Sequence, residues 1–68
     1  MNKFSVRLCE LRDEKKLSQG KLATEFGISQ NTLSSWEKGK HEPSFDMLVK
    51  IAAFFGCTTD YLLGVTDY

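Results

Sequence analysis

The stretch from Ser18 to Gly39 constrains the fold more than any other part of this 68-residue sequence. A serine precedes each of two segments in which apolar residues recur three or four positions apart, the spacing of one helical face. Gly27 follows the first segment, and glycine is a common residue where a chain leaves a helix. The stretch therefore predicts two short helices, residues 19–26 and 30–38, joined by a tight turn.

The second of these helices has an unusual polar face. It carries amides and hydroxyls in place of the Glu, Lys and Arg that favour surface helices. Glutamine and asparagine can each pair twice with the major-groove edge of adenine, so this composition indicates a surface that reads another molecule. A polar face that only meets solvent is the simpler alternative. The side chains concerned are Gln30, Asn31, Thr32, Ser34 and Ser35.

Three further helices are predicted from apolar spacing and capping residues. Residues 3–15 repeat apolar side chains at i, i+4 and i+7, while residues 45–55 and 59–63 each follow a residue with a capping hydroxyl. Phe45 is expected on the buried face of its helix. No segment has the pattern of a strand or a repeat. The predicted fold class is therefore all-α, with residues 1–68 forming one domain as a compact five-helix bundle.

Composition restricts the class of protein. Apolar residues make up 41% of the chain and charged residues 26%, which is ordinary for a small globular domain. No apolar run approaches the roughly 18 residues of a membrane span, and no signal-peptide pattern opens the sequence. We therefore expect a cytoplasmic protein with no membrane contact. Cys9 and Cys57 have no histidine nearby, so they are expected to remain thiols, with no metal site.

No arrangement of residues points to catalysis. The sequence has no Gly-x-Ser-x-Gly motif, no paired carboxylates and no Gly-rich phosphate loop. His41 stands alone in the predicted loop 39–43, without a nucleophile or a second ligand at a useful spacing. A 68-residue helical bundle also lacks a cleft of catalytic size. The chain is predicted not to be an enzyme and to need no cofactor.

The charges cancel over the whole chain but are unevenly distributed. Residues 1–21 hold six cations against three carboxylates (+3), residues 22–43 two against three (−1), and residues 44–68 one against three (−2). A neutral total weakens the attraction to phosphate. Lys38 and Lys40 nevertheless follow the polar helix directly, where they could hold a nucleic-acid backbone.

The whole pattern resembles the phage repressor/Cro family of helix-turn-helix transcription regulators, from about residue 4 to residue 64. The resemblance implies a lambda-repressor-like DNA-binding domain, in which residues 30–38 enter the major groove of duplex DNA. No single residue is diagnostic, because the likeness lies in the set and its spacing. The matching residues are Leu8, Leu11, Arg12, Gln19, Ala23, Gly27, Ile28, Leu33, Trp36, Glu37, Gly39, Lys40, Pro43, Asp60, Tyr61, Leu62, Leu63 and Gly64.

The resemblance assigns roles to individual side chains. Gln30 and Asn31 match positions where relatives touch bases. Ser35, one turn further on, matches another such position, although a serine reaches less far than the Arg or Gln of many relatives. Gln19 matches a phosphate-contacting residue. The complete set of DNA-binding candidates is Ser18, Gln19, Ser29, Gln30, Asn31, Thr32, Ser35, Lys38 and Lys40.

Two structural expectations accompany these roles. The resemblance implies an ion pair between Arg12 and Glu37, which lie next to apolar residues at the border of the core, where an unpaired charge is costly. Lys16 stands at the joint after the first helix, where many relatives carry glycine. A positive φ at Lys16 would cost about 1 kcal/mol.

A single reading helix covers few base pairs, and regulators of this family usually bind palindromic sites as two-fold dimers. We therefore expect a homodimer on a palindromic operator, acting as a repressor. The interface is expected near the last two helices, where apolar residues exceed the needs of a small monomer. The candidates are Phe54, Tyr61, Val65 and Tyr68.

A protein-binding module with the same fold, of the antitoxin or anti-repressor kind, is the alternative function. The neutral net charge favours this alternative. The two lysines directly after the polar helix favour DNA, because a reading helix and flanking cations then occur together.

Overall fold

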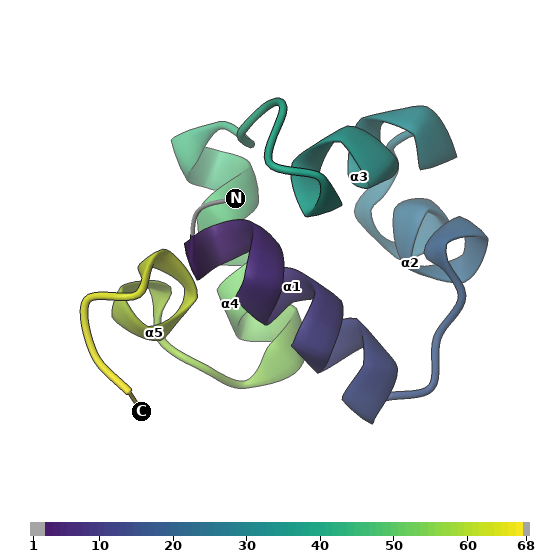
Figure 1. The fold of residues 1–68 in the computed structure, drawn as a ribbon. Helices are drawn as coiled ribbons and strands as arrows, with labels where there is room; N and C mark the ends of the chain where they lie inside the picture. The colour runs from purple at the N-terminus through teal and green to yellow at the C-terminus, as the bar shows by residue number, and fades with distance from the viewer. Residues whose placement is uncertain (1–2, 68) are drawn as a thin grey trace.

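Five helices make up the computed structural model, which describes residues 3–67 (Figure 1). The first and third helices end one residue earlier than predicted, and the other three have the predicted bounds. No strand occurs within the described residues, so the all-α fold class is confirmed. The helices are α1 (Lys3–Glu14), α2 (Gln19–Phe26), α3 (Gln30–Glu37), α4 (Phe45–Phe55) and α5 (Thr59–Leu63).

Hydroxyl side chains determine where four of these helices begin. Each capping residue lies in extended backbone, and its oxygen accepts a hydrogen bond of 3.0–3.1 Å from the backbone N–H three residues later. Such a cap satisfies an N–H group that has no partner inside the helix, and it contributes about 1 kcal/mol. The caps are Ser18, Ser29, Ser44 and Thr58.

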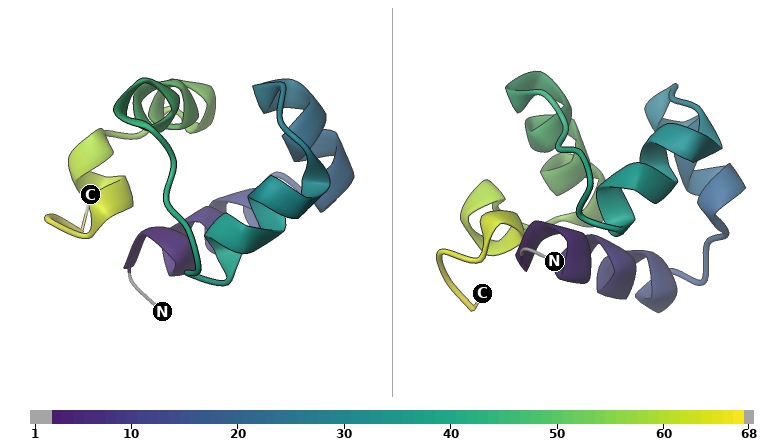
Figure 2. Two further views of the ribbon diagram at one scale, coloured as in Figure 1. Left: turned by 90° about the horizontal axis from the view of Figure 1, so that it is seen from above. Right: turned by 45° about the horizontal axis from the view of Figure 1, so that its top comes forward.

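The right view of Figure 2 shows α4 and the α2–α3 pair on opposite sides of the molecule, with α1 running below them. Helix α4 packs against α2 and α5. The start of α1 lies beside α5, and α1 also packs against α3 (Figures 1 and 2). Within residues 3–67, no helix combines the length and apolar character that crossing a membrane requires.

All five helices contribute to one hydrophobic core. Trp36 is 5% exposed, as expected for a residue on the apolar side of α3. Side chains with no exposed surface come from every helix, so each element is held by burial of apolar area. The core consists of Phe4, Leu8, Leu22, Ala23, Phe26, Leu33, Trp36, Ile51, Ala52 and Leu62.

Phe45 is the exception, because the prediction that it is buried is wrong. It is 88% exposed, whereas the buried residues of α4 are Ile51 and Ala52, in the second half of the helix. Phe45 is the first residue of α4, at the end that projects away from α1 (Figure 2). Helical spacing puts Phe45 on the same side of α4 as Leu48 and Ala52, but at this end of the helix its side chain is left uncovered.

The joint between α1 and α2 depends on the backbone of Lys16. Its φ is 56°, and among the described residues it alone has positive φ without being glycine. This conformation lets the Leu17 N–H donate to the Arg12 carbonyl at 3.2 Å and the Lys16 N–H donate to Asp13 at 3.0 Å. These bonds satisfy carbonyls at the end of α1, at the steric cost expected for a side chain in the left-handed region.

Arg7 ties the segment after α5 back to α1, which the sequence did not reveal. Its Nη1 donates to the backbone carbonyls of Tyr61 and Thr66, the latter at 2.6 Å. Its Nη2 lies 3.3 Å from a carboxylate oxygen of Asp67, and the guanidinium sits 4.2 Å from the centre of the Tyr61 ring. Arg7 is only 9% exposed, so these contacts replace much of its hydration.

Candidate nucleic-acid interface

The turn between α2 and α3 positions the candidate reading helix. Gly27 takes φ 68°, which allows α2 to end and Ile28 to point inward, where it packs against the core. Ser29 then caps α3. Because glycine adopts this left-handed conformation without the steric cost of a side chain, the tight turn between two packed helices is inexpensive at this position.

One side of α3 is buried and the other is exposed, as the sequence predicted. Leu33 and Trp36 face the core, whereas Gln30, Asn31 and Thr32 are exposed. The hydroxyls of Ser29 and Thr32 lie 2.9 Å apart, and the Ser29 oxygen also accepts from the Thr32 N–H. These two hydroxyls therefore serve the start of α3, while the two amides are the larger polar groups at its exposed end.

The predicted contact between Arg12 and Glu37 is present. Arg12 Nε lies 2.7 Å from one carboxylate oxygen of Glu37, and Nη2 lies 3.2 Å from the other, which is the two-bond geometry that suits a guanidinium and a carboxylate. The hydrogen bonds to Glu37 raise the pKa of Arg12 above its usual value. Nη1 also donates to the Leu17 carbonyl at 2.9 Å, which anchors the joint before α2.

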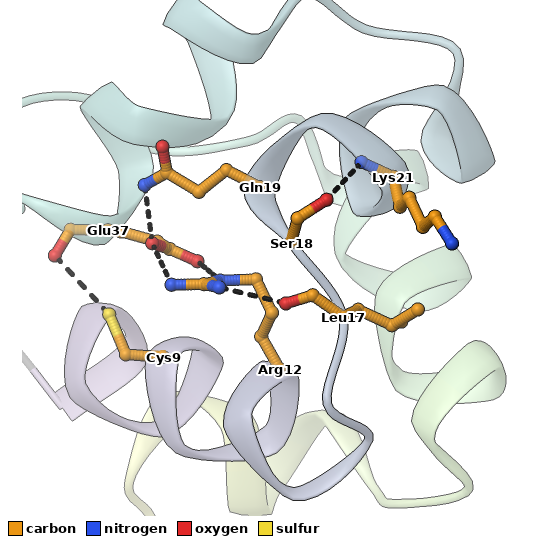
Figure 3. Close-up of polar contacts among 7 residues, drawn as sticks. All are labelled: Cys9, Arg12, Leu17, Ser18, Gln19, Lys21 and Glu37. Atoms are coloured by element: carbon orange, nitrogen blue, oxygen red, sulfur yellow. Dashed lines mark hydrogen bonds and ion pairs between the residues drawn. The ribbon is translucent and has the colours of Figure 1, made fainter.

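Gln19 joins this cluster, although the sequence suggested only a phosphate contact for it. Its Nε2 donates to Glu37 at 2.8 Å, and Figure 3 shows Gln19 and Arg12 converging on the same carboxylate. The Cys9 thiol lies 3.9 Å from the Glu37 backbone oxygen, and burial raises the pKa of this thiol. The contact between Gln19 and Glu37 joins side chains 18 positions apart, and local periodicity contains no signal for it.

The start of α2 borders a shallow hollow of about 480 Å³. The Ser18 hydroxyl accepts from the Lys21 N–H at 3.1 Å, as Figure 3 shows, so one of the free N–H groups at this helix end is already used. A Cβ atom built on Gly20 would lie 3.6 Å from the amide oxygen of Gln30, which places the Gln30 side chain next to this helix end. The candidate phosphate and base contacts of α2 and α3 are therefore adjacent.

The chain folds back on itself after α3. Gly39 has φ 76°, and the Lys40 N–H donates to the Ser35 carbonyl at 3.0 Å, which is the bond that closes a helix end in a Schellman motif. Lys38 and Lys40 are both exposed on this loop. The reversal brings the His41 ring against α3, where its Nδ1 lies 2.5 Å from the Ser35 hydroxyl.

The residues predicted for a dimer interface near α5 differ in how far their side chains are buried. Phe54 is partly buried and packs edge-to-face on Phe26 and Phe55 at 5.4 and 5.0 Å between ring centres, so its ring contributes to the core. Tyr61 is half-buried under Arg7, whereas Val65 is 70% exposed. Tyr68 lies outside the described residues.

Residues 3–67 contain no cluster of three or more His, Cys, Asp or Glu side chains that could hold a metal ion. Both cysteines are free thiols, and burial raises the pKa of each, which keeps them protonated near neutral pH.

The known proteins that resemble this sequence are helix-turn-helix regulators of transcription. A model of the helix-turn-helix family matches residues 10–62. The HTH-type transcriptional activator BcrR of Enterococcus faecalis is 40% identical over 60 residues, which cover 88% of this chain and 29% of that protein. The CTXphi phage repressor RstR of Vibrio cholerae is 36% identical over 53 residues, covering 78% and 48% of the two chains. The chain thus spans about half or less of these two relatives, which are regulators rather than enzymes.

Solved structures show the same likeness. The P22 c2 repressor, in a crystal structure with synthetic operator 9T, matches with a TM-score of 0.84 and 28% identity, over 93% of this chain and 96% of that one. The solution structure of the DNA-binding domain of the same Salmonella phage P22 protein gives a TM-score of 0.81 and 31% identity. Because the family pattern covers most of the chain and the fold agrees, the chain belongs to the helix-turn-helix family, among phage repressors and related transcriptional regulators.

Proposed function

We propose that this protein is a sequence-specific duplex DNA-binding regulator of transcription that acts as a repressor, with α3 reading the major groove. The observation that carries the proposal is the two-sided construction of α3. Gln30 and Asn31 are exposed at its beginning, while Leu33 and Trp36 bury its other side. Glu37 anchors its end to α1, so the polar side is presented by a helix that cannot easily turn.

The resemblance to the P22 c2 repressor supports this docking. That protein has been solved in complex with a synthetic operator, and its fold matches 93% of this chain. In helix-turn-helix proteins, the second helix of the motif enters the major groove with its N-terminal residues toward the bases. The exposed amides of this chain lie at that end of α3, and amides can pair with the N6 and N7 groups of adenine.

The remaining candidates are proposed to hold the DNA backbone. Exposed Lys38 and Lys40 follow the reading helix and supply positive charge there. Gln19 uses one amide N–H for Glu37, and an amide has a second N–H that could reach a phosphate. Three hydroxyl residues lie at the starts of α2 and α3, where backbone N–H groups favour anions: Ser18, Ser29 and Thr32.

We further propose that the regulator acts as a homodimer on a palindromic operator. Exposed apolar side chains occur around α4 and α5, including Phe45 at 88%, Leu63 at 50% and Val65 at 70% exposure. Tyr61 is half-buried beside them, and its exposed edge can contribute. Phe54 is the weakest of the original candidates, because its ring packs on Phe26 and Phe55.

A protein-binding function is the second candidate, and the same apolar surface favours it. Phe45 and Val49 are 88% and 60% exposed at i and i+4 on α4, and the net charge of the chain is zero. A module of this kind would bind a partner through α4 and would make no specific use of Gln30 or Asn31. The two functions therefore predict different responses to DNA.

Duplex binding measured at two salt concentrations separates the two functions. If two lysines per protomer neutralise four phosphates in a dimer, the affinity falls with a slope of about −3.6 in log–log form, or roughly 150-fold between 50 and 200 mM salt. A pool of random duplexes should also yield a palindromic preferred site. Absence of duplex binding at low salt would reject the DNA function and leave the protein-binding module.

A further inference from the structure

We propose that His41 is a base-reading residue, and that Ser35 holds its imidazole ring at the edge of the reading surface. In the sequence, His41 is an isolated loop residue, and Ser35 matches a base-contacting position but reaches less far than the Arg or Gln of many relatives. The structure joins them, with the Ser35 hydroxyl 2.5 Å from His41 Nδ1. The proposal rests on the DNA-binding function of α3 and deepens it by naming an additional determinant of specificity.

The geometry places the ring among the candidate base contacts. Asn31, Thr32, Ser35, Trp36 and His41 line one open hollow of about 290 Å³. Asn31 and Ser35 are separated by one helical turn and so share a face of α3. The imidazole ring therefore borders the same surface as a proposed base-reading amide, although His41 belongs to the loop.

The backbone explains why the ring lies there. Gly39 adopts a left-handed conformation, and the Lys40 N–H closes the helix end on the Ser35 carbonyl at 3.0 Å. The next residue is then directed back along α3, so a side chain six positions after Ser35 can meet it. The same motif thus ends the helix and delivers an additional polar side chain to its exposed face.

The tautomer of His41 decides what the ring offers to DNA, because either atom of the Ser35–His41 hydrogen bond can be its donor. We take the form in which the Ser35 hydroxyl donates to Nδ1, so that the neutral ring carries its proton on Nε2. Nε2–H is then a donor on the side of the ring opposite Nδ1. The ligand that it fits is an acceptor on a base edge in the major groove, such as purine N7, guanine O6 or thymine O4.

Three substitutions of His41 test this assignment. The amide nitrogen of His41→Asn resembles Nδ1 in position, so this variant can keep Ser35 as a partner but loses the donor at Nε2. The amide nitrogen of His41→Gln lies close to the place of Nε2 and keeps that donor. His41→Ala loses both. The readout is the affinity of each variant for the preferred palindrome and for its single-base-pair variants, at one salt concentration.

The expected result is loss of preference at one base pair per half-site. His41→Ala and His41→Asn should each lose about 5- to 150-fold in affinity for the preferred site, the range for one mismatched pair. Both should then bind all four base pairs at that position with equal affinity. His41→Gln should retain part of the preference. The affected pair should differ from the pair that Gln30→Ala affects.

Ser35→Ala tests the positioning role. The imidazole remains but is no longer held, so the same base pair should be affected less strongly than in His41→Ala. The double variant Ser35→Ala/His41→Ala should lose no more affinity for the preferred site than His41→Ala alone, because both substitutions disrupt the same Ser35–His41 pair. Thermal unfolding of each variant checks that the fold is intact; Ser35→Ala and His41→Gln supply the comparison if His41→Ala does not fold.

Two outcomes would overturn the inference. Equal losses on the preferred site and on random duplexes would make His41 a backbone contact, and unchanged base preference in all three variants would leave it without a reading role. Both results require that the unaltered protein binds duplex DNA selectively. If it does not, the proposed DNA-binding function fails instead, so the two failures are distinguishable.

Discussion

At the scale of single residues, three helices meet at the carboxylate of Glu37. Arg12 from α1 and Gln19 from α2 both donate to it, and Glu37 itself ends α3 (Figure 3). The Glu37 side chain is 5% exposed and that of Arg12 is 19% exposed. Because a buried carboxylate without partners is costly, this pair should respond strongly to removal of either partner.

We predict that Arg12→Ala lowers the free energy of unfolding by about 3–5 kcal/mol, because it leaves Glu37 buried with only Gln19 as a side-chain partner. That loss is large against the total stability of a small domain. Urea unfolding of Arg12→Ala, Glu37→Ala and the double variant gives the coupling between the two residues. Asp13→Ala, an exposed neighbour on α1, is the matched control and should change little. A coupling near zero would show that the pair contributes no more than a solvent-exposed one.

A substitution at Lys16 should stabilise the fold instead. Its φ of 56° suits glycine better than lysine, and the residue is exposed. We predict that Lys16→Gly raises the free energy of unfolding by about 0.5–1 kcal/mol, because the steric cost of a Cβ in the left-handed region exceeds the extra chain entropy of glycine. Glu10→Gly, at an exposed position inside α1, should instead destabilise by about 1 kcal/mol. Parallel thermal melts compare the two; destabilisation by both would contradict the argument.

The fold was largely predictable, because capping residues, turn glycines and helical spacing act within short stretches of sequence. Ser29 and Gly27 mark the two sides of the turn through their own hydrogen-bonding and conformational preferences, which do not depend on distant residues. Helical spacing likewise identified Leu33 and Trp36 as core residues. Phe45 shows the limit of this reasoning, since spacing gives the side of a helix but not whether a neighbour covers it.

Contacts of the site between distant residues were less predictable. The pairing of Gln19 with Glu37 depends on how α2 crosses the end of α3, which no local pattern contains. The bond between Ser35 and His41 depends on the backbone reversal at Gly39. The Arg12–Glu37 pair was predictable only through the family resemblance, which carries information about contacts between distant positions.

At the scale of elements, α3 combines a buried apolar side with an exposed polar side. Its inner side packs on the core and its last turn is tied to α1, so changes on the outer side should alter recognition more than stability. Gln30 is exposed at the start of the helix, and Lys40 is exposed on the loop after it. The two residues should therefore contribute to binding in different ways.

We predict that Gln30→Ala costs about 1–3 kcal/mol on the preferred site and relaxes preference at one base pair, because an amide can pair with a base edge. Lys40→Ala should weaken binding to all duplexes alike and reduce the salt slope by about 0.9 per protomer, or about 1.8 for the proposed dimer. Titrations of specific and random duplexes at several salt concentrations measure both effects. Lys50→Ala, an exposed lysine on α4, is the control for charge alone. Equal losses on specific and random DNA from Gln30→Ala would contradict this division.

At the scale of the whole molecule, size and charge both point to assembly. The longest dimension of the domain is 28 Å, whereas half-sites one helical turn apart have centres separated by about 34–36 Å. One protomer therefore cannot reach both halves of a palindrome. The net charge of zero also gives a single copy little general attraction to DNA, which favours the proposed dimer, with its two reading helices held at a fixed distance.

The spacing of the operator tests this assembly. We predict that five base pairs inserted between the half-sites abolish most of the affinity, because they turn the two half-sites to opposite faces of the duplex. A ten-base-pair insertion restores the face but adds about 34 Å of separation, more than the length of a protomer, so a rigid dimer should not recover. Leu63→Asp, which places a charge on the proposed apolar interface, should lower affinity for the palindrome but leave an isolated half-site bound as before. Sedimentation and duplex titration measure assembly and binding separately. Affinity that does not change with either insertion would mean that the protomers bind independently.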